Sequence, residues 1–462
     1  MRLLLAVWMG KLYMHLARAF HMGGGTSFPG ILARKIEPAT LRKLSLRLKQ
    51  GAVMVTGTNG KTTTNKMLNN ILKQVGISPI YNLSGANLPG GVTTAFLDHA
   101  TLMGRPKSDL ALLEIDEAAM PRVAADVVPR VVIVTNFFRD QLDRYGELDH
   151  TVALIRSALA TLPASSTVLL NADDPLVSSL GKDLAAQVIY FGLEDARQEA
   201  GEKFQTADAK FCTNCGAEYS YSAVYYGHLG KYRCPRCGNA RPDPQIYASS
   251  IEIEGMQRSR IHVVTPQKQF SLTLNLPALY NVYNALAAVG AALSLGIEVE
   301  AIRKGIESVS SAFGRMEKIS IEGKEVVMAL VKNPTGFNEV LHTLLSDKQP
   351  KKLMILINDN PADGEDVSWL WDVDFEMLAE PGIVESTVVS GIRAGDMAVR
   401  LKYAGADVGR LRIDGDFKSA FRSALAGVNP GETLYVLPTY TAMLDLRKFI
   451  HKMGYVKNFW EE

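Results

Sequence analysis

Short apolar runs alternate with longer segments of helical periodicity along much of the chain. The runs lie at 52–55, 110–115, 131–134, 167–170 and 188–191, and again at 353–357, 387–390 and 433–437. Strands that are covered on both faces read as continuous apolar runs, because helices pack on each side of a parallel sheet. The pattern therefore predicts an α/β protein with a mostly parallel sheet, followed by a second α/β domain.

The first twenty residues have a different pattern. An apolar run follows a charge, as in a signal peptide, but Lys11 and Arg18 interrupt the run. Helical spacing is shared by Leu4, Val7, Trp8, Lys11, Leu12, His15 and Leu16. We expect an amphipathic helix that packs on its own protein, with contact to a membrane surface as the alternative. No later stretch approaches the roughly 20 apolar residues of a membrane span, which favours a soluble, cytoplasmic protein that is at most peripheral to the membrane.

Breaks in the pattern suggest how the chain is divided. Gly23, Gly24, Gly25, Pro29 and Gly30 form a cluster of helix breakers. Residues 204–245 interrupt the α/β alternation with four cysteines and no long apolar run, and a helix is expected to begin near Asn281. We therefore predict an N-terminal helix and linker (1–44), a central domain (45–317) with an insertion at 204–245, and a C-terminal α/β domain (318–462).

A glycine-rich segment after the first predicted strand has the features of a phosphate-binding loop. It reads VMVTGTNGKTTTNKMLNNIL at 53–72 and leads into a helical pattern. Glycines allow backbone amides to face a phosphate, and the N-terminus of the helix adds favourable partial charge. Lys61 can neutralise phosphoryl oxygens and Thr62 can bind magnesium. The segment therefore predicts an ATP site.

The spacing GTNGKTT resembles the phosphate loop of the Mur ligase and folylpolyglutamate synthase superfamily, and further segments follow in that family's order. These are LLEIDE at 112–117, TNFFRDQLDRYGE at 135–147, NADDP at 171–175, YNVYNALAA at 280–288 and GRME at 314–317. The resemblance implies a P-loop central domain and a Rossmann-like C-terminal domain. It implies that Glu114 binds Mg²⁺ together with Thr62, and it assigns nucleotide contacts to Gly57, Thr58, Asn59, Gly60, Lys61, Thr62, Thr63, Asn136, Asn281, Asn284 and Arg315.

The second of these segments departs from the family at one position. Asp143, Arg144 and Gly146 agree with the family motif, but Gln141 stands where many Mur ligases have a histidine that helps to hold a second magnesium. A second metal is therefore not expected from this segment.

The cysteines form two CxxC pairs within the insertion, Cys212 with Cys215 and Cys234 with Cys237. Four thiolates from two tight turns suit tetrahedral zinc, and a site with four protein ligands is structural because no position is open to water. Disulfides are the alternative, and nothing else in the sequence indicates export. These are the only four cysteines of the chain, so no thiol remains for glutamine hydrolysis. Ammonia drawn from glutamine would have to come from another polypeptide.

Within the superfamily, the chain most resembles the MurT-type synthetases. The similarity lies in the short segment before the phosphate loop, the cysteine-rich insertion, EIDE, TNFFRDQLDRYGE and NDNPADGEDVSWLWDVDFE at 358–376. It implies ATP-dependent amidation of the α-carboxylate of D-glutamate in the lipid II stem peptide, through an acyl phosphate. Ammonia would come from a GatD-type glutamine amidotransferase subunit, and Asp366 would orient the histidine of that partner. Trp369, Leu370 and Trp371 are candidates to anchor the partner surface.

Two other functions stay open at this point. A ligase that adds an amino acid to a folate or peptidoglycan precursor would use the same phosphate loop. A P-loop protein whose zinc ribbon binds nucleic acid is the second. Arg233, Arg236 and Arg241 are modest beside the basic and aromatic surfaces of such proteins, and the net charge of +2 adds no support, so no nucleic acid is expected.

Overall fold

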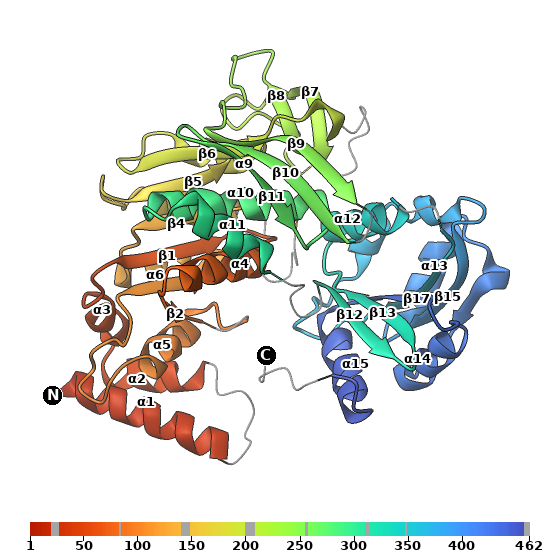
Figure 1. The fold of residues 1–462 in the computed structure, drawn as a ribbon, viewed down its shortest axis with the longest axis horizontal. Helices are drawn as coiled ribbons and strands as arrows, with labels where there is room; N and C mark the ends of the chain where they lie inside the picture. Colours follow the sequence, from red (N-terminus) through yellow and green to blue (C-terminus); the bar gives the residue numbers. More distant parts are fainter. Residues whose placement is uncertain are drawn as a thin grey trace.

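The computed structural model describes residues 1–19, 27–82, 85–139, 148–198, 208–254, 257–309, 315–346 and 349–456. Figure 1 shows a central sheet with helices on both faces, a group of N-terminal helices beneath it, a small hairpin above it, and a second α/β unit at its side.

The central sheet has nine strands in the order β11-β10-β9-β6-β5-β4-β1-β3-β2. It is parallel from β2 to β9, and β10 and β11 continue it antiparallel. The prediction of a mostly parallel sheet is therefore confirmed. The strands are β1 (Gly51–Thr56), β2 (Ile80–Tyr81), β3 (Leu110–Glu114), β4 (Val131–Val134), β5 (Thr167–Asn171), β6 (Gln187–Leu193), β9 (Ile246–Glu254), β10 (Arg258–Val264) and β11 (Gln269–Leu274).

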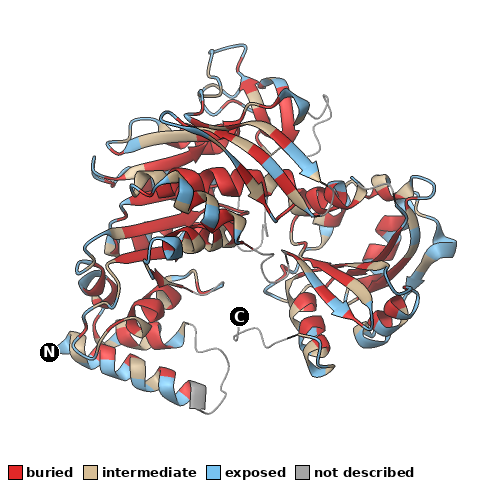
Figure 2. Ribbon diagram, viewed as in Figure 1, coloured by how far each residue is buried: buried red, intermediate tan, exposed pale blue. Residues whose placement is uncertain are grey.

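Alternate residues of the buried strands enter separate cores on the two faces. Val53 and Val55 of β1 pack in one core, whereas Ala52 and Met54 pack in the other. The first core is closed by α4 (Lys61–Gln74), α10 (Leu279–Ser294) and α11 (Val299–Glu307). The second is closed by α5 (Pro89–Asp98), α6 (Met120–Asp126) and α8 (Leu148–Leu159), and Figure 2 shows the sheet buried between these layers.

The second sheet has six strands in the order β12-β13-β17-β14-β15-β16, in which β12 alone is antiparallel to its neighbour. Its strands are β12 (Arg315–Ile321), β13 (Lys324–Ala329), β14 (Lys351–Leu356), β15 (Val384–Ser390), β16 (Leu411–Ile413) and β17 (Thr433–Pro438). The helices that cover it are α12 (Pro334–Leu345), α13 (Ala394–Tyr403), α14 (Phe417–Ala426) and α15 (Tyr440–Lys452). Strand β12 begins three residues before the domain start expected at 318.

Three helices precede the phosphate loop: α1 (Arg2–Ala19), α2 (Phe28–Ile36) and α3 (Thr40–Ser45). The helix expected at the N-terminus is confirmed as α1, and it packs on its own protein as expected, but only Val7 of the residues at helical spacing is buried. Trp8, Leu12 and Leu16 are about half exposed, because small residues on the other side of α1 allow it to approach α2 and α5 closely. Of the expected breaker cluster, Gly23–Gly25 lie outside the described residues, and Pro29 and Gly30 lie inside α2.

The described part of the insertion forms a two-stranded hairpin, β7 (Ser220–Tyr226) and β8 (Leu229–Arg233), with a small core of cysteines and tyrosines. Among the helices of the described residues, none is long and apolar enough to cross a bilayer.

Candidate active site

The phosphate loop joins β1 to α4, as the sequence predicts. Gly57 and Gly60 both have positive φ, at 119° and 91°. A Cβ atom on Gly57 would lie 2.3 Å from the Thr135 hydroxyl, and one on Gly60 would lie 2.1 Å from the side-chain oxygen of Asn284. Glycine is therefore required at both positions by conformation and by space.

Residues after β4 hold the loop in place. The Asn136 side-chain oxygen accepts a hydrogen bond from the Asn59 amide at 2.9 Å, and its amide nitrogen donates to the Asn59 carbonyl at 3.2 Å. The Thr135 hydroxyl also donates to the Asn59 carbonyl, at 2.7 Å. The side chain of Asn136, expected to contact nucleotide, thus fixes the loop while it lines the pocket beside it.

Lys61 is held by an acidic residue that the sequence analysis left without a role. Its ammonium lies 2.7 Å from the Glu117 carboxylate, and both side chains are largely buried. The ammonium also donates to the Gly57 carbonyl at 2.5 Å. Glu117 follows Glu114 by three residues in EIDE, so the motif contained it, but nothing in the spacing distinguished it from a solvated carboxylate.

Thr62 and Glu114 are adjacent, as predicted. The Thr62 hydroxyl donates to the Glu114 carboxylate at 2.8 Å, and Glu114 is only 4% exposed. The Asn82 side chain holds the backbone of Glu114 from both sides, at 2.9 Å to its amide and 2.8 Å to its carbonyl. A hydroxyl and a carboxylate fixed beside a phosphate loop are oxygen ligands of the kind that Mg²⁺ takes in nucleotide sites. These residues therefore fit the expected magnesium.

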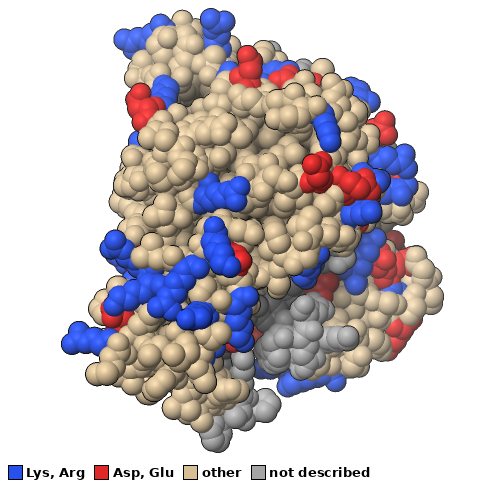
Figure 3. Space-filling view, turned by 60° about the vertical axis from the view of Figure 1, so that its left-hand side comes forward, with Lys and Arg blue, Asp and Glu red and all other residues tan. Residues whose placement is uncertain are grey.

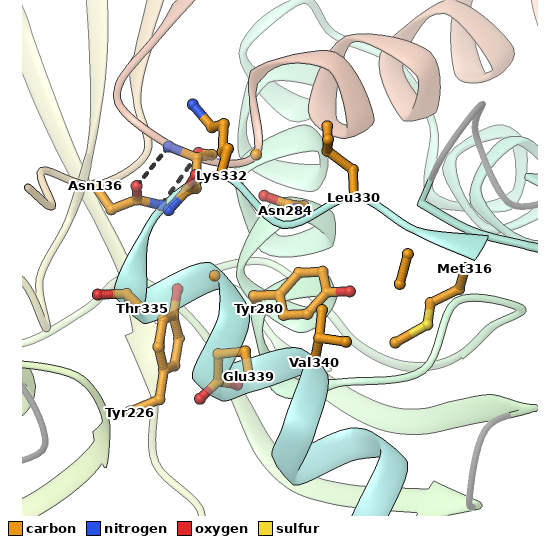
Figure 4. Close-up of a pocket in the computed structure, with 14 residues that line it drawn as sticks. Asn136, Tyr226, Tyr280, Asn284, Met316, Leu330, Lys332, Thr335, Glu339 and Val340 are labelled. Atoms are coloured by element: carbon orange, nitrogen blue, oxygen red, sulfur yellow. Dashed lines mark hydrogen bonds between the residues drawn. The ribbon is translucent and has the colours of Figure 1, made fainter. Parts of the chain in front are cut away.

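A pocket opens next to the loop, between the central sheet and the C-terminal unit. Its empty space amounts to about 720 Å³, which includes solvent at its open side. Figure 4 shows its walls, which come from both units: Asn59, Gly60, Asn136, Tyr226, Tyr280, Asn284, Met316, Ala329, Leu330, Lys332, Thr335, Gly336, Glu339 and Val340. The pocket therefore exists only where the two units meet.

The C-terminal unit also reaches the loop directly. The Asn333 side chain donates to the side-chain oxygen of Asn59 at 3.3 Å, and the Lys332 ammonium lies 3.5 Å from the Thr58 carbonyl. On the other side, the Asn284 amide donates to the Asn281 side-chain oxygen at 3.2 Å, which brings together two asparagines predicted as nucleotide contacts. The sequence did not predict the contacts of Lys332 and Asn333 with the loop, because a Lys-Asn pair after a strand is not a phosphate-binding motif.

The pocket contains a buried carboxyl group, that of Glu339 on α12. Burial raises its pKa to about 8, so the group is mostly protonated at neutral pH. Beside it lies Tyr226 from the tip of the insertion hairpin, whose pKa is raised by burial and by the nearby Glu339, Asp174 and Asp173. A neutral carboxyl can both donate and accept hydrogen bonds, which suits recognition of a polar but uncharged group.

The four cysteines converge, as the two CxxC pairs predict. All their sulfurs lie within 4.8 Å of one another, with Cys212 and Cys237 at 3.6 Å and Cys215 and Cys234 at 3.5 Å. These distances exclude disulfides, which require about 2 Å, and they are close to the edge of roughly 3.8 Å of a tetrahedron built on zinc–sulfur bonds. The residues therefore fit a structural zinc ion.

The hairpin tip reaches from the zinc cluster to the active site. A Cβ on Gly227 would lie 2.9 Å from the Phe138 ring and 3.4 Å from the Thr335 methyl group, so the tip touches both units. His228 at the tip is fully buried, with one ring nitrogen 3.4 Å from the Asp174 carboxylate. The insertion is therefore part of the wall of the pocket.

Protein groups contact both carboxylates of the NADDP segment. Asp173 is fully buried and accepts from the Arg241 guanidinium at 2.5 Å and from the Tyr283 hydroxyl at 2.6 Å. Asp174 caps a short helix, α9 (Pro175–Ser178), and accepts from the Phe137 amide at 2.8 Å. Both carboxylates are occupied by protein groups, so the segment ties the insertion to the sheet.

Asp366 is exposed in the loop before the short 3₁₀ helix η4 (Ser368–Asp372). Its carboxylate accepts from the Ser368 amide at 2.7 Å and from the Ser368 hydroxyl at 2.9 Å, and these bonds lower its pKa. Of the expected anchor residues, Leu370 is buried and Trp369 packs against Phe337, so only Trp371 is exposed. It lies 5.8 Å from the exposed ring of Tyr403.

Some residues of the expected site cannot be placed. Gln141, Asp143, Arg144 and Gly146 lie outside the described residues, as does the side chain of Arg315, whose backbone begins β12.

Comparison with known proteins gives matches over nearly the whole chain. Residues 55–292 match the Mur ligase middle domain, and residues 330–443 match the MurT ligase C-terminal family. The MurT subunit of lipid II isoglutaminyl synthase (glutamine-hydrolyzing) from Staphylococcus aureus strain N315 is 36% identical, over 98% of each chain. The MurT subunit from Streptococcus pneumoniae is 33% identical, over 93% of each chain.

Solved structures share the fold at lower identity. A pseudomurein peptide ligase type C from Methanothermus fervidus has a TM-score of 0.65 and 24% identity, with 89% of this chain and 80% of that chain covered. MurF from Thermotoga maritima, solved in complex with ADP, has a TM-score of 0.63 and 14% identity, with 91% and 84% covered.

Proposed function

The chain belongs to the MurT group of the Mur ligase family, and on that premise we propose that it is the synthetase subunit of a lipid II isoglutaminyl synthase. In this function, ATP activates the α-carboxylate of D-glutamate in the lipid II stem peptide as an acyl phosphate. Ammonia then displaces phosphate and leaves D-isoglutamine. The lipid-linked substrate would be met at the cytoplasmic face of the membrane.

One observation carries the proposal most directly. Lys61, Thr62 and Glu114 follow or contact the same phosphate loop whose Asn59 and Gly60 line a pocket formed by both units, in a chain related over nearly its full length to MurT subunits. The relatives of the chain are synthetase subunits of one kind, which supports the type of reaction. The side chains supply what phosphoryl transfer requires, namely a cation, ligands for a metal ion and a loop of backbone amides.

The chain's own residues have separable tasks in this reaction. Lys61 would exchange the Glu117 carboxylate for phosphoryl oxygens and offset the charge that develops on them. Thr62 and Glu114 would hold Mg²⁺, which would offset the negative charge of the phosphoryl oxygens. Asn136, Asn284 and Lys332 would position the nucleotide, because they line the pocket next to the loop. Asn281 would act behind them, because its side-chain oxygen accepts a hydrogen bond from the Asn284 amide. Cys212, Cys215, Cys234 and Cys237 would hold a structural zinc ion.

The source of the ammonia follows from the cysteine content. All four cysteines of the chain belong to the metal cluster, so hydrolysis of glutamine would need the thiol of a partner, here a GatD-type amidotransferase. Asp366 supports this assignment because its carboxylate is exposed and is held in one orientation by Ser368. It could orient the partner's histidine, as the third member of a catalytic triad does.

The test uses the complex with a candidate amidotransferase and lipid II as substrate. We expect wild type to convert the acid to the amide, seen by mass analysis, with either glutamine or ammonium as nitrogen source. Asp366→Asn should be inactive with glutamine and active with ammonium, because an amide cannot stabilise an imidazolium as a carboxylate does. Lys61→Ala should be inactive with both.

Asp372→Asn is the matched control, since Asp372 is an exposed aspartate six residues further on in η4. It should behave as wild type. If the Asp366 variant fails with ammonium while the complex still forms, Asp366 belongs to the ligase chemistry and the partner assignment is wrong. Phosphate release that depends on an added amino acid, with no ammonia-dependent product, would instead select the amino-acid ligase.

A further inference from the structure

Helix α1 buries one side and exposes an opposite side that is equally apolar. Its small and buried residues, Ala6, Val7, Gly10, Met14 and Ala17, face α2 and α5. On the other side, exposure is 49% for Leu5, 50% for Trp8, 38% for Met9, 52% for Leu12 and 46% for Leu16. At about 100° per residue these five positions fall within an arc of roughly 100°, the width of a helix face that is normally covered.

A neighbouring loop extends this exposed row. The Trp8 indole donates to the Leu102 carbonyl at 2.9 Å, so the loop at 101–106 lies against α1. Leu102 and Met103 in this loop are 63% and 65% exposed. We call the set Leu5, Trp8, Met9, Leu12, Leu16, Leu102 and Met103 the apolar strip. Contiguous exposed apolar surface of this kind marks an interaction site in a soluble protein.

The charge around the apolar strip is strongly positive. Residues 1–50 contain nine Lys and Arg and one acidic residue, a formal charge of +8. The remaining 41 basic and 47 acidic residues give −6, so the near-neutral total hides a charged N-terminal region. The single acidic residue, Glu37, is paired with Lys43 at 2.6 Å. Figure 3 shows Lys and Arg side chains gathered at the lower left, in the area of the N-terminal helices, beside an uncharged surface.

Basic residues lie directly beside the apolar strip. Arg2 and Lys11 occupy the flanks of α1, between its exposed and buried sides. Arg47 donates to the Gly104 carbonyl at 2.5 Å, which places its guanidinium next to the loop that carries Leu102 and Met103. Arg105 and Lys107 at the end of the same loop are exposed.

We propose that the apolar strip docks α1 in the plane of an anionic lipid bilayer, with the surrounding Lys and Arg at the level of the headgroups. An interfacial helix of this kind has Trp and Leu on the buried face and basic residues at its flanks. Anionic lipids contribute about 1 kcal/mol for each Lys or Arg near the surface. The indole of Trp8 suits the headgroup region because it is apolar with one polar group.

Other occupants fit the surface less well. Nucleic acid would use the positive charge but would leave an aliphatic row in water. A protein partner would need an acidic rim around an apolar centre, and lysine is depleted at protein interfaces. The biological role of this docking rests on the proposed function, because an enzyme whose substrate is linked to a lipid acts at the membrane surface.

The first experiment measures vesicle binding by the full chain, with vesicles that contain no lipid II. We expect binding to vesicles of phosphatidylglycerol and phosphatidylcholine at low salt, loss of binding as salt is raised, and weak binding to phosphatidylcholine alone. Leu5→Gln/Leu12→Gln should weaken binding about tenfold or more, because two partly exposed leucines no longer enter the bilayer. Both residues are exposed, so melting temperature should not change.

Val408→Gln/Ile413→Gln is the matched control, since these residues are 58% and 56% exposed on the C-terminal unit. It should bind vesicles as wild type does. The proposal is overturned if wild type does not bind the anionic vesicles at low salt, or if both double variants bind equally well. It is also overturned if Leu5→Gln/Leu12→Gln abolishes assembly with the amidotransferase and leaves vesicle binding intact, because the apolar strip is then a protein interface.

A second measurement separates this proposal from the proposed function. A water-soluble lipid II analogue with a shortened isoprenoid chain should be amidated equally well by wild type and by Leu5→Gln/Leu12→Gln, whereas lipid II in vesicles should be amidated much more slowly by the variant. If wild type amidates neither substrate, the proposed function is wrong, and the vesicle-binding experiment alone then tests whether α1 docks on the bilayer. If the variant is equally slow on the soluble analogue, the strip acts on the chemistry and the docking proposal fails.

Discussion

Glu339 gives the sharpest prediction because its protonation links the pocket to stability. Its pKa is about 8 in the folded protein and 4.5 when the group is freely solvated. The folded state therefore holds a proton that the unfolded chain has released over this pH range. The contribution to stability is fully present below pH 4.5 and is lost as the pH rises through 8. Glu339→Gln keeps the shape and the hydrogen-bonding capacity of the neutral acid but does not titrate.

The size of the effect follows from the linkage relation. Within the range, stability falls with each pH unit by the energy of one pKa unit, so the step from pH 5.5 to 7.5 amounts to roughly 2–3 kcal/mol. For a unit the size of the C-terminal domain this corresponds to a change of roughly 10 °C in melting temperature. We therefore expect the melting temperature of Glu339→Gln, relative to that of wild type, to rise by roughly 10 °C between pH 5.5 and pH 7.5.

The assay is thermal melting of both proteins over a series of buffers, so that titration of all other groups cancels in the difference. Glu380→Gln serves as the control, because Glu380 is exposed in the same domain. Its difference from wild type should not depend on pH. A constant difference for Glu339→Gln as well would refute the reasoning, since the carboxyl would then titrate alike in the folded and unfolded states.

Three further predictions concern the loop and the metals. Gly60→Ala should abolish phosphate release and lower the free energy of unfolding by about 1–3 kcal/mol, because it combines a positive φ with a close contact to Asn284. The control Gly76→Ala also has a positive φ but open space around the new methyl group, so it should keep activity. Glu114→Gln should require far more Mg²⁺ for turnover, measured by titrating the metal; an unchanged requirement would remove the residue from the metal site. Cys212→Ser should contain no zinc in metal analysis and should bind nucleotide more weakly, because the hairpin supplies Tyr226 to the pocket. Tight nucleotide binding by a zinc-free variant would show that the metal site does not support the pocket.

The sequence was informative where one physical requirement dominates. Strands buried on both faces must be apolar throughout, so β1 and β3 to β6 could be located to within a residue or two at each end. Strands β9, β10 and β11 were missed because they carry exposed polar residues between buried ones and lie outside the parallel part of the sheet. Local pattern indicates a strand only when burial leaves little choice of residue.

The site was predictable for residues adjacent in sequence to the phosphate loop, or matching a motif, and not for the rest. Lys332 and Glu339 have no local signature, and EIDE contains Glu117 without indicating its contact with Lys61, because these roles depend on which elements the fold brings together. NADDP shows the reverse case. Its carboxylates look available for ligands in the sequence, but Arg241 of the insertion occupies Asp173 and backbone amides occupy Asp174.

The buried pair of Asp173 and Arg241 has a consequence for the history of the insertion. Arg241 comes from the insertion and Asp173 from the sheet, and both are almost wholly buried. Loss of Arg241 alone would leave the buried Asp173 charge without this partner, at a cost of about 3–5 kcal/mol, which is a large part of the stability of an ordinary domain. Among descendants of this chain, Arg241 and Asp173 are therefore expected to be kept together or replaced together. The buried ion pair therefore favours retention of the zinc ribbon in descendants, independently of any benefit from the metal ion itself.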